Sequence, residues 1–396
     1  MTLERHKRAG AICFCLFLCL LGGGQALAES PDQLAGSPAA IRVDFTKNKI
    51  SVKAIQGFSN RSTGRALMPD DPVRVASVSK FFVALGVMRL VEAGKLDLHT
   101  DINQYLDWSI RNPAFPDDPI TLSHLMSHQS GLRDGINYAL PMDVLLEDEL
   151  SNPEAWEPDH KPGTYFAYAN LNSPVIAAVM EAATDERFDQ IMQDEVFKPL
   201  KLDACFNWVN CRDAKIVDAV TLYRPNGDVA RDDLRGVREK CSVVPAKNGS
   251  CNLTKYQLGK TGSVFSPQGG LRISAMDLAR VGQMFLREGE GFLKSKTLQD
   301  MADPIWTYDG TNGDTEEGYF CAYALGIHIS NNDRGSHADC NDDPFDNGYT
   351  YWGHSGDAYS LKSGLWFTDG DYSGTAFFRT EVPEDDPVGH CIYFCE

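Results

Sequence analysis

The chain has 396 residues, of which 43% are hydrophobic and 23% are charged, and its formal net charge is −18 at pH 7. This length is enough to bury a large core and predicts two lobes. The strong acidity argues against nucleic acid or an anionic membrane surface as a partner.

The first residues are typical of a secretory signal peptide. Three basic residues within positions 5–8 precede the apolar run 11–21, and Ala26-Leu27-Ala28 supplies small residues for cleavage, so the segment 1–28 is removed. The run is short for a transmembrane helix, and an uncleaved anchor is the alternative. Cleavage leaves 34 basic and 54 acidic residues, a net charge of −20 over 368 residues. We therefore expect a periplasmic or secreted protein with no membrane insertion after cleavage.

Cysteines beyond the signal segment predict disulfides, because their number is even and the chain is exported. Their spacing favours pairing between neighbours, although eight cysteines allow 105 pairings. The alternative is a metal cluster, which the absence of a C-x2-C spacing disfavours. The expected pairs are Cys205 with Cys211, Cys241 with Cys251, Cys321 with Cys340, and Cys391 with Cys395.

The N-terminal part of the mature chain predicts strands. Residues 29–38 are a loose leader, and 41–45 and 50–57 then alternate apolar and polar residues, which predicts a β-hairpin. A loop rich in turn-forming residues follows over 59–72.

The stretch 78–93 is apolar on most of its surface, which predicts a helix buried in the middle of the domain. Gly94 ends it, as glycine commonly does at a helix C-terminus. Ser77 and Lys80 fall at the positive end of this helix, about one turn apart on one face. A serine hydroxyl is a weak nucleophile until a base takes its proton, and a buried neutral lysine can be that base.

Residues 96–200 are predicted to be mostly helical, with helices over 121–126, 172–183 and 187–197. The stretch 203–255 has little periodicity and holds four cysteines. It therefore predicts an excursion tied by disulfides.

The last part of the chain has one more helix, over 275–288, and returns to strands over 323–330, 359–367 and 374–381. Strands thus lie at both ends of the chain and helices in the middle. This order predicts an α+β fold, in which one antiparallel sheet is built from both chain ends, flanked by helices, with a mainly helical lobe inserted.

We expect one domain over 29–396. Its α/β lobe comprises about 39–95 and 256–396, and its helical, disulfide-tied lobe spans about 96–255. Neither an internal repeat nor a long linker divides it.

Two short motifs follow Ser77 and Lys80 along the chain, Tyr168-Ala169-Asn170 and His354-Ser355-Gly356. S-x-x-K, Y-x-N and H-x-G in this order resemble the serine hydrolases related to class C β-lactamases and DD-peptidases, the penicillin-recognising fold. The resemblance covers about residues 40–380. Three supporting segments also match: Leu96-Asp97-Leu98, residues 127–132, and Pro199-Leu200.

The resemblance implies roles for the first two motifs. Ser77 resembles the nucleophile that becomes acylated, and Lys80 its base partner. Tyr168 resembles the tyrosine that shares the proton transfers to the leaving group and the deacylating water. Asn170 resembles the amide that positions Lys80 and the substrate. The family's chemistry implies no cofactor and no metal.

The third motif implies the substrate-binding strand. His354, Ser355 and Gly356 are implied to line the pocket, and the backbone N–H groups of Ser77 and Asp357 to form the oxyanion hole. Many β-lactamases have a lysine at the position of His354, whose fixed charge helps to hold a β-lactam carboxylate. Histidine is mostly neutral at pH 7, and Asp357 adds negative charge. Both departures favour esterases and DD-peptidases over a dedicated β-lactamase.

Each residue also has a purely structural alternative. Ser77 can cap its helix, Tyr168 can be a core aromatic residue, and His354 can be a structural histidine of an edge strand. We interpret His128 as a hydrogen-bonding group at a helix end rather than a catalyst.

Three other patterns are interpreted as chance matches. Lys260-Thr261-Gly262 spells the family's third motif but precedes Gly269-Gly270-Leu271, which it should follow. Residues 353–357 resemble a lipase elbow, but the fifth residue is not glycine and only His390 follows as a base. The acidic run 337–346 lacks the spaced ligands of a calcium loop.

The sequence therefore predicts an exported serine hydrolase that cleaves an ester or amide through an acyl-Ser77 intermediate, like an esterase or a D-Ala-D-Ala carboxypeptidase. The alternatives are a β-lactamase, or a penicillin-recognising sensor or peptidoglycan-binding protein without turnover. The expected partner is a small-molecule or peptidoglycan-derived substrate. Nothing in the sequence predicts the oligomeric state.

Overall fold

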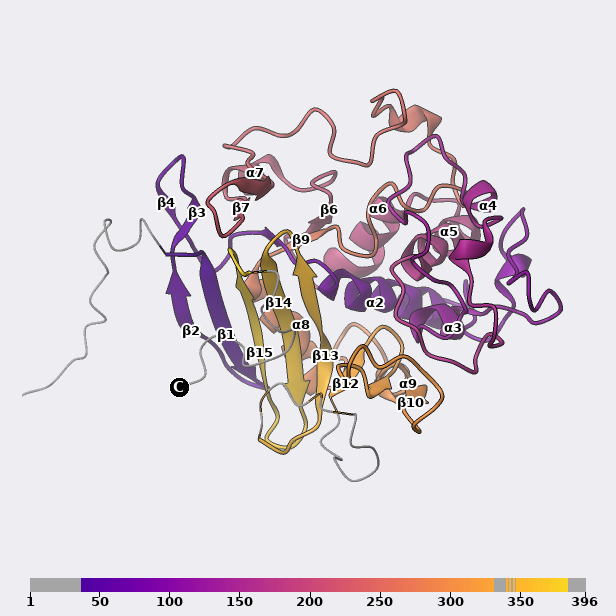
Figure 1. The fold of residues 1–396 in the computed structure, drawn as a ribbon. Helices are drawn as coiled ribbons and strands as arrows, with labels where there is room; N and C mark the ends of the chain where they lie inside the picture. Colours follow the sequence, from indigo (N-terminus) through magenta and orange to yellow (C-terminus); the bar gives the residue numbers. More distant parts are fainter. Residues whose placement is uncertain (1–36, 331–339, 341, 343–344, 346, 384–396) are drawn as a thin grey trace, which may run out of the picture.

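The computed structural model describes residues 37–330, 340, 342, 345 and 347–383. Its main element is an eight-stranded antiparallel sheet of order β10-β11-β12-β13-β14-β15-β1-β2, and a three-stranded sheet has the order β5-β9-β6 (Figure 1). The strands are β1 (Ala40–Thr46), β2 (Ile50–Gln56), β3 (Phe58–Asn60), β4 (Arg65–Ala66), β5 (Val73–Arg74), β6 (Cys205–Phe206), β7 (Leu222–Tyr223), β8 (Val229–Arg231), β9 (Leu271–Ile273), β10 (Trp306–Thr307), β11 (Ala322–Tyr323), β12 (His328–Ser330), β13 (Tyr351–Ala358), β14 (Leu361–Thr368) and β15 (Ser373–Arg379).

Most of the helices are short. The α-helices are α2 (Val78–Glu92), α3 (Leu122–Met126), α4 (Leu146–Glu149), α5 (Asn172–Thr184), α6 (Phe188–Met192), α7 (Asp213–Val217), α8 (Ala275–Leu286) and α9 (Ser295–Ala302). The remaining turns are 3-10 helices at η1 (Ile102–Gln104), η2 (Pro153–Ala155) and η4 (Leu253–Lys255), and a π-helix at η3 (Gln193–Phe197).

Both ends of the described chain contribute to the large sheet. The predicted hairpin forms as β1 and β2, and β1 pairs with β15, with Ile41 opposite Phe378. Figure 1 shows the indigo N-terminal strands directly beside the yellow C-terminal ones. The predicted α+β fold is confirmed.

The predicted buried helix is also confirmed, as α2. It contacts β13 and β14 on one side and α5 and α6 on the other (Figure 1). Phe81 of α2 lies 5.0 Å from the Phe285 ring of α8 and 6.3 Å from the Phe367 ring of β14. An aromatic cluster thus fixes α2, and with it Ser77, against the sheet.

The three helices predicted within 96–200 are confirmed, as α3, as α5, and as α6 with η3. The prediction that this stretch is mostly helical is wrong. Before α5 this stretch holds only short helices between turns and loops, because proline, glycine, aspartate and asparagine interrupt the apolar periodicity. The predicted strand 323–330 is a pair of short strands, and Tyr359 and Ser360 form the turn between β13 and β14. In sequence order the large sheet still comes from residues 40–56 and 306–379, and we propose the two lobes expected above on that basis.

Three predicted disulfides are confirmed, Cys205–Cys211, Cys241–Cys251 and Cys321–Cys340. The fourth expected pair and the signal segment lie outside the described residues, as does most of the acidic run 337–346. Among the described residues, no helix has both the length and the apolar character needed to cross a membrane.

Candidate active site

Ser77 lies where β5 turns sharply into α2. Ala76, just before it, has a φ of 46°, a left-handed conformation that is uncommon outside glycine. Ser77 occupies the N-cap position, but its side chain makes no capping hydrogen bond. The capping alternative is therefore contradicted, and the hydroxyl is left for other partners.

The amine of Lys80 has three hydrogen-bonding partners, and the Ser77 hydroxyl is one of them. Its Nζ lies 2.9 Å from Ser77 Oγ, 2.8 Å from Asn170 Oδ1 and 3.1 Å from the carbonyl oxygen of Gln268. The two carbonyl oxygens can only accept hydrogen bonds. A neutral amine directs its two hydrogens to them, and its lone pair then faces the Ser77 hydroxyl.

The environment of Lys80 favours this neutral form. The side chain is only 5% exposed, and burial lowers the pKa of its ammonium to about 7. Asp134 and Glu316 oppose this shift by their negative charge. Lys80 can therefore accept a proton near neutral pH.

Asp134 fixes the orientation of the Asn170 amide. Its Oδ2 accepts hydrogen bonds at 2.9 Å from both the backbone N–H and the Nδ2 of Asn170, and its Oδ1 accepts one from Leu171. A carboxylate accepts but does not donate, so Nδ2 faces Asp134 and Oδ1 faces Lys80. Sequence reasoning missed this residue, because it lies in a turn-rich stretch without a motif.

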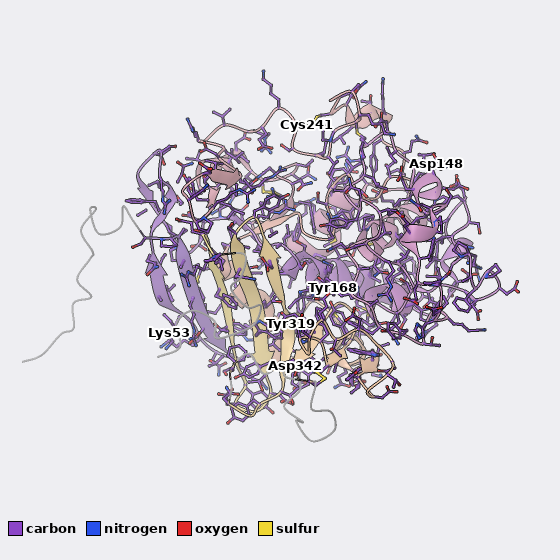
Figure 2. The ribbon with its side chains drawn as sticks, viewed as in Figure 1. Lys53, Asp148, Tyr168, Cys241, Tyr319 and Asp342 are labelled. Atoms are coloured by element: carbon purple, nitrogen blue, oxygen red, sulfur yellow. A yellow bond between two sulfur atoms is a disulfide. The ribbon has the colours of Figure 1, made fainter. Side chains whose placement is uncertain are left out.

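The Tyr168 ring is stacked between two others, His128 at 4.3 Å and Phe320 at 4.9 Å. Its hydroxyl is hydrogen-bonded to Ser77, while burial raises the pKa of the Tyr168 phenol well above its ordinary value. Tyr168 therefore stays protonated and can pass a proton, whereas Lys80 is the group that can accept one. Figure 2 shows Tyr168 at the junction between the large sheet and the helices.

The His128 ring is stacked on the Tyr168 ring and supports it. Its Nδ1 accepts hydrogen bonds from the Ala169 N–H and from Asn172 Nδ2, both at 3.1 Å. Burial lowers the pKa of the His128 imidazole well below its ordinary value. The neutral ring thus holds the Y-A-N segment in place and does not contact Ser77.

The H-S-G strand β13 passes close to the nucleophile. A Cβ on Gly356 would lie 2.2 Å from the carbonyl oxygen of Val75 and 3.2 Å from Ala76 Cβ. Only glycine allows this approach. The backbone of the next residue, Asp357, is thereby held beside Ser77.

The side chains of this strand do not reach the pocket in the expected way. The His354 ring is 2% exposed, and its Nε2 is 2.9 Å from the Tyr323 hydroxyl. Burial, with a smaller contribution from the Lys80 charge, lowers the pKa of the His354 imidazole to about 3. The Ser355 hydroxyl is hydrogen-bonded to Tyr319, and Asp357 forms an ion pair with Lys362.

Two expectations about the strand need correction for that reason. The His354 imidazole is placed to orient Tyr323 rather than to touch a substrate, which agrees with its structural alternative. The negative charge expected from Asp357 is compensated by Lys362.

A pocket of about 530 Å³ opens beside Ser77. Asn170, Gln268, Gly269 and Asp357 line it, and so do residues 137–139 and 243–245. It is large enough for a small organic acyl group.

A family model described as Beta-lactamase matches residues 27–389. The chain belongs to the β-lactamase family. It is 27% identical to Esterase EstB of Burkholderia gladioli over 296 residues, which are 70% of this chain and 71% of the esterase.

Solved structures show the same fold at low identity. The octameric penicillin-binding protein homologue from Pyrococcus abyssi has a TM-score of 0.62 at 19% identity, over 88% of this chain and 71% of that one. The D-amino acid amidase of Ochrobactrum anthropi has a TM-score of 0.59 at 18% identity, over 91% and 92%. Membership of the β-lactamase family and the relationship to an esterase establish a serine hydrolase of the β-lactamase-related type.

The literal K-T-G of this β-lactamase-family chain lies away from Ser77, as expected. Lys260 forms an ion pair with Asp107 at 2.8 Å. A Cβ on Gly262 would lie 2.0 Å from the carbonyl oxygen of Pro174 in α5. This tripeptide therefore packs against a helix and is not among the residues that line the pocket beside Ser77.

Proposed function

We propose that this protein is an exported serine hydrolase that cleaves an ester or amide bond through an acyl-Ser77 intermediate. The observation that carries the proposal is the set of three contacts around the Lys80 amine. When the amine is neutral and donates to the two carbonyl oxygens, its lone pair faces Ser77 Oγ. Export is supported by the disulfides, which form in oxidising compartments.

In the proposed reaction, Lys80 takes the hydroxyl proton while Ser77 Oγ forms a bond to the substrate carbonyl carbon. The carbonyl oxygen becomes an oxyanion beside the backbone N–H groups of Ser77 and Asp357. The bond to the leaving group then breaks, and that group receives the proton through Tyr168. Water attacks the acyl carbon next, which releases the acid and restores the Ser77 hydroxyl.

We propose an activity of the esterase or D-Ala-D-Ala carboxypeptidase type. The relationship to an esterase supports it, and so does the low pKa of His354, because a neutral imidazole cannot replace the lysine that holds a β-lactam carboxylate. A β-lactamase is the second candidate. A sensor without turnover is disfavoured by the hydrogen bond between Tyr168 and Ser77, since this places a proton-transfer group at the acyl bond.

A side-by-side assay tests the proposal with short-chain nitrophenyl esters, nitrocefin and a D-Ala-D-Ala peptide. We expect steady turnover of the esters or the peptide and much slower turnover of nitrocefin. Faster turnover of nitrocefin than of the other two would favour the β-lactamase. A single burst without a steady state on all three would favour the sensor.

A further inference from the structure

Arg74 and Arg272 lie opposite each other in the three-stranded sheet beside Ser77. Arg74 of β5 pairs with Arg272 of β9, so both side chains project on the same face of the sheet. Arg74 is 7% exposed and Arg272 is 1% exposed. Two buried guanidinium groups side by side require negative charge nearby.

Arg272 has that charge. Its Nε and Nη2 donate to both carboxylate oxygens of Asp232, at 3.2 and 2.9 Å, and its Nη1 donates to Asn207 and Gly270. Burial alone would raise the pKa of the Asp232 carboxyl, but the Arg272 guanidinium holds it below its ordinary value. Asp232 is thus an ionised counter-ion that hydrogen-bonds Arg272, and Arg231 Nε lies farther away, at 3.8 Å from its Oδ1.

Arg74 has no equivalent partner among the described residues. Its Nε is buried without a hydrogen bond, and its guanidinium stacks on the Tyr359 ring at 5.0 Å. Burial, and then the charge of Arg272, lower the pKa of the Arg74 guanidinium to about 9. Glu239, a carboxylate near Arg231 and Arg272, is exposed. Asp357 lines the same pocket as Arg74 but is ion-paired with Lys362.

The unpaired guanidinium faces the pocket that holds the nucleophile. Arg74, Ser77, Arg231 and Tyr359 all line that pocket. A Cβ on Gly269 would lie 3.6 Å from Arg74 Nη2, so the missing side chain of this glycine leaves Nη2 open to the pocket. Arg231 also lies over the Tyr359 ring, at 5.8 Å.

We propose that this pocket is a subsite for a carboxylate on the acyl part of the substrate, with Arg74 as its main binding residue and Arg231 at its entrance. A guanidinium binds a carboxylate through two parallel hydrogen bonds, which satisfies the unpartnered donors. The lining residues include Ser77 but not Tyr168, so an acyl group enters this pocket while the leaving group lies toward Tyr168. This inference rests on the proposed acyl-Ser77 chemistry and specifies its substrate as an acyl chain that ends in an acid.

The test compares nitrophenyl monoesters of the dicarboxylic acids from succinate to adipate. Each monoester is paired with the same compound in which the free carboxyl group is converted to a methyl ester. The two members of a pair differ in the charge at the far end of the acyl chain. We expect wild-type kcat/KM to favour the charged member about tenfold at the best chain length, as a charge-assisted hydrogen bond gives. Reactions without enzyme supply the background of self-hydrolysis to subtract.

Variants assign the preference to a residue. Arg74→Gln should reduce the ratio of charged to neutral kcat/KM to about one, and Arg231→Gln should lower it about two- to threefold. The ratio is taken within each variant, so a general loss of activity cancels. Arg287→Gln is the control and should keep the wild-type ratio, because Arg287 follows the end of α8 and donates to the Lys47 carbonyl oxygen.

A wild-type preference that persists in Arg74→Gln would overturn the subsite, and so would equal rates within every pair. If Arg74→Gln does not fold, the subsite is tested by competitive inhibition of the wild-type protein. Adipate should compete with a neutral ester at least about tenfold better than adipamide does, and equal inhibition would contradict the subsite. Turnover of the neutral esters reports the proposed function separately, because its absence together with a lack of Ser77 acylation would reject the hydrolase itself.

Discussion

Two groups of residues meet at Ser77: a catalytic wall with Lys80 and Asn170, and a pocket wall with Arg74 and Gln268. They differ in how completely their polar groups are hydrogen-bonded. On the catalytic wall, the Lys80 amine has three partners and Asn170 is held by Asp134. On the pocket wall, Arg74 Nε and Gln268 Oε1 are buried without a partner. Catalytic groups act best when they are oriented before the substrate arrives, whereas groups that bind substrate can be left for the ligand to satisfy.

The largest expected effect tests the catalytic wall. Ser77→Ala and Lys80→Ala should each lower kcat by roughly 10⁴- to 10⁶-fold, because the two residues act as one unit. Steady-state hydrolysis of a nitrophenyl ester measures this loss. Ser79→Ala is the matched control, since its hydroxyl donates to the Ala76 carbonyl and accepts from the Leu271 N–H instead of contacting a reacting atom. A loss of only a few-fold in Lys80→Ala would show that Lys80 is structural.

The next effect separates the two buried arginines. Asp232→Asn should lower the free energy of unfolding by about 3–5 kcal/mol, because it leaves Arg272 buried without its counter-ion. Arg74→Gln should change it far less, since that guanidinium has no counter-ion to lose. Denaturant unfolding of both variants measures the difference. Equal destabilisation would mean that Arg74 is paired in solution and that the pocket wall is not unsatisfied.

A smaller effect is expected when the support of Asn170 is weakened. Asp134→Asn should lower kcat roughly 10²-fold, because the amide that orients Lys80 loses its fixed position. The Asp134 charge also raises the pKa of Lys80, so the acid limb of the pH profile should move to lower pH. A merely structural role would lower the rate and leave the acid limb at its wild-type pH. Such a profile would contradict a positioning role.

The smallest expected effect is the dependence of the rate on pH. The pKa of Lys80 is lowered to about 7, and only the deprotonated amine can accept the Ser77 proton. The rate should therefore rise with pH through about 7 and fall about tenfold per unit below it. Burial also raises the pKa of the Glu316 carboxyl to about 7, so Glu316→Gln is the control. It should keep the rise but move it to lower pH, because the Glu316 charge raises the pKa of Lys80. A flat profile between pH 5 and 9 would contradict Lys80 as the base.

The catalytic wall was largely predictable from the sequence. Ser77 and Lys80 lie one helical turn apart, and Tyr168 lies two residues from Asn170, so short motifs capture them. The buried helix, the terminal sheet and the three helices within 96–200 were predictable from periodicity. The loops between those three helices were not, since their interrupted pattern was interpreted as mostly helical.

The supporting and binding residues gave no such signal. Gln268 contributes a backbone carbonyl to Lys80, which any residue could supply. Asp134 and Phe320 reach the site from separate loops. Nothing in the sequence distinguishes Arg74 from the other arginines. Only the tertiary structure shows that Asp232 bonds Arg272 instead of Arg74.

The most direct test of the central claim is to trap the acyl-enzyme analogue. Wild-type protein is treated with a fluorophosphonate, and its intact mass and its peptides are measured. We predict one adduct per chain, on the peptide that contains Ser77, and none in Ser77→Ala. An identical adduct in Ser77→Ala, or an active protein that takes up no adduct, would contradict Ser77 as the nucleophile.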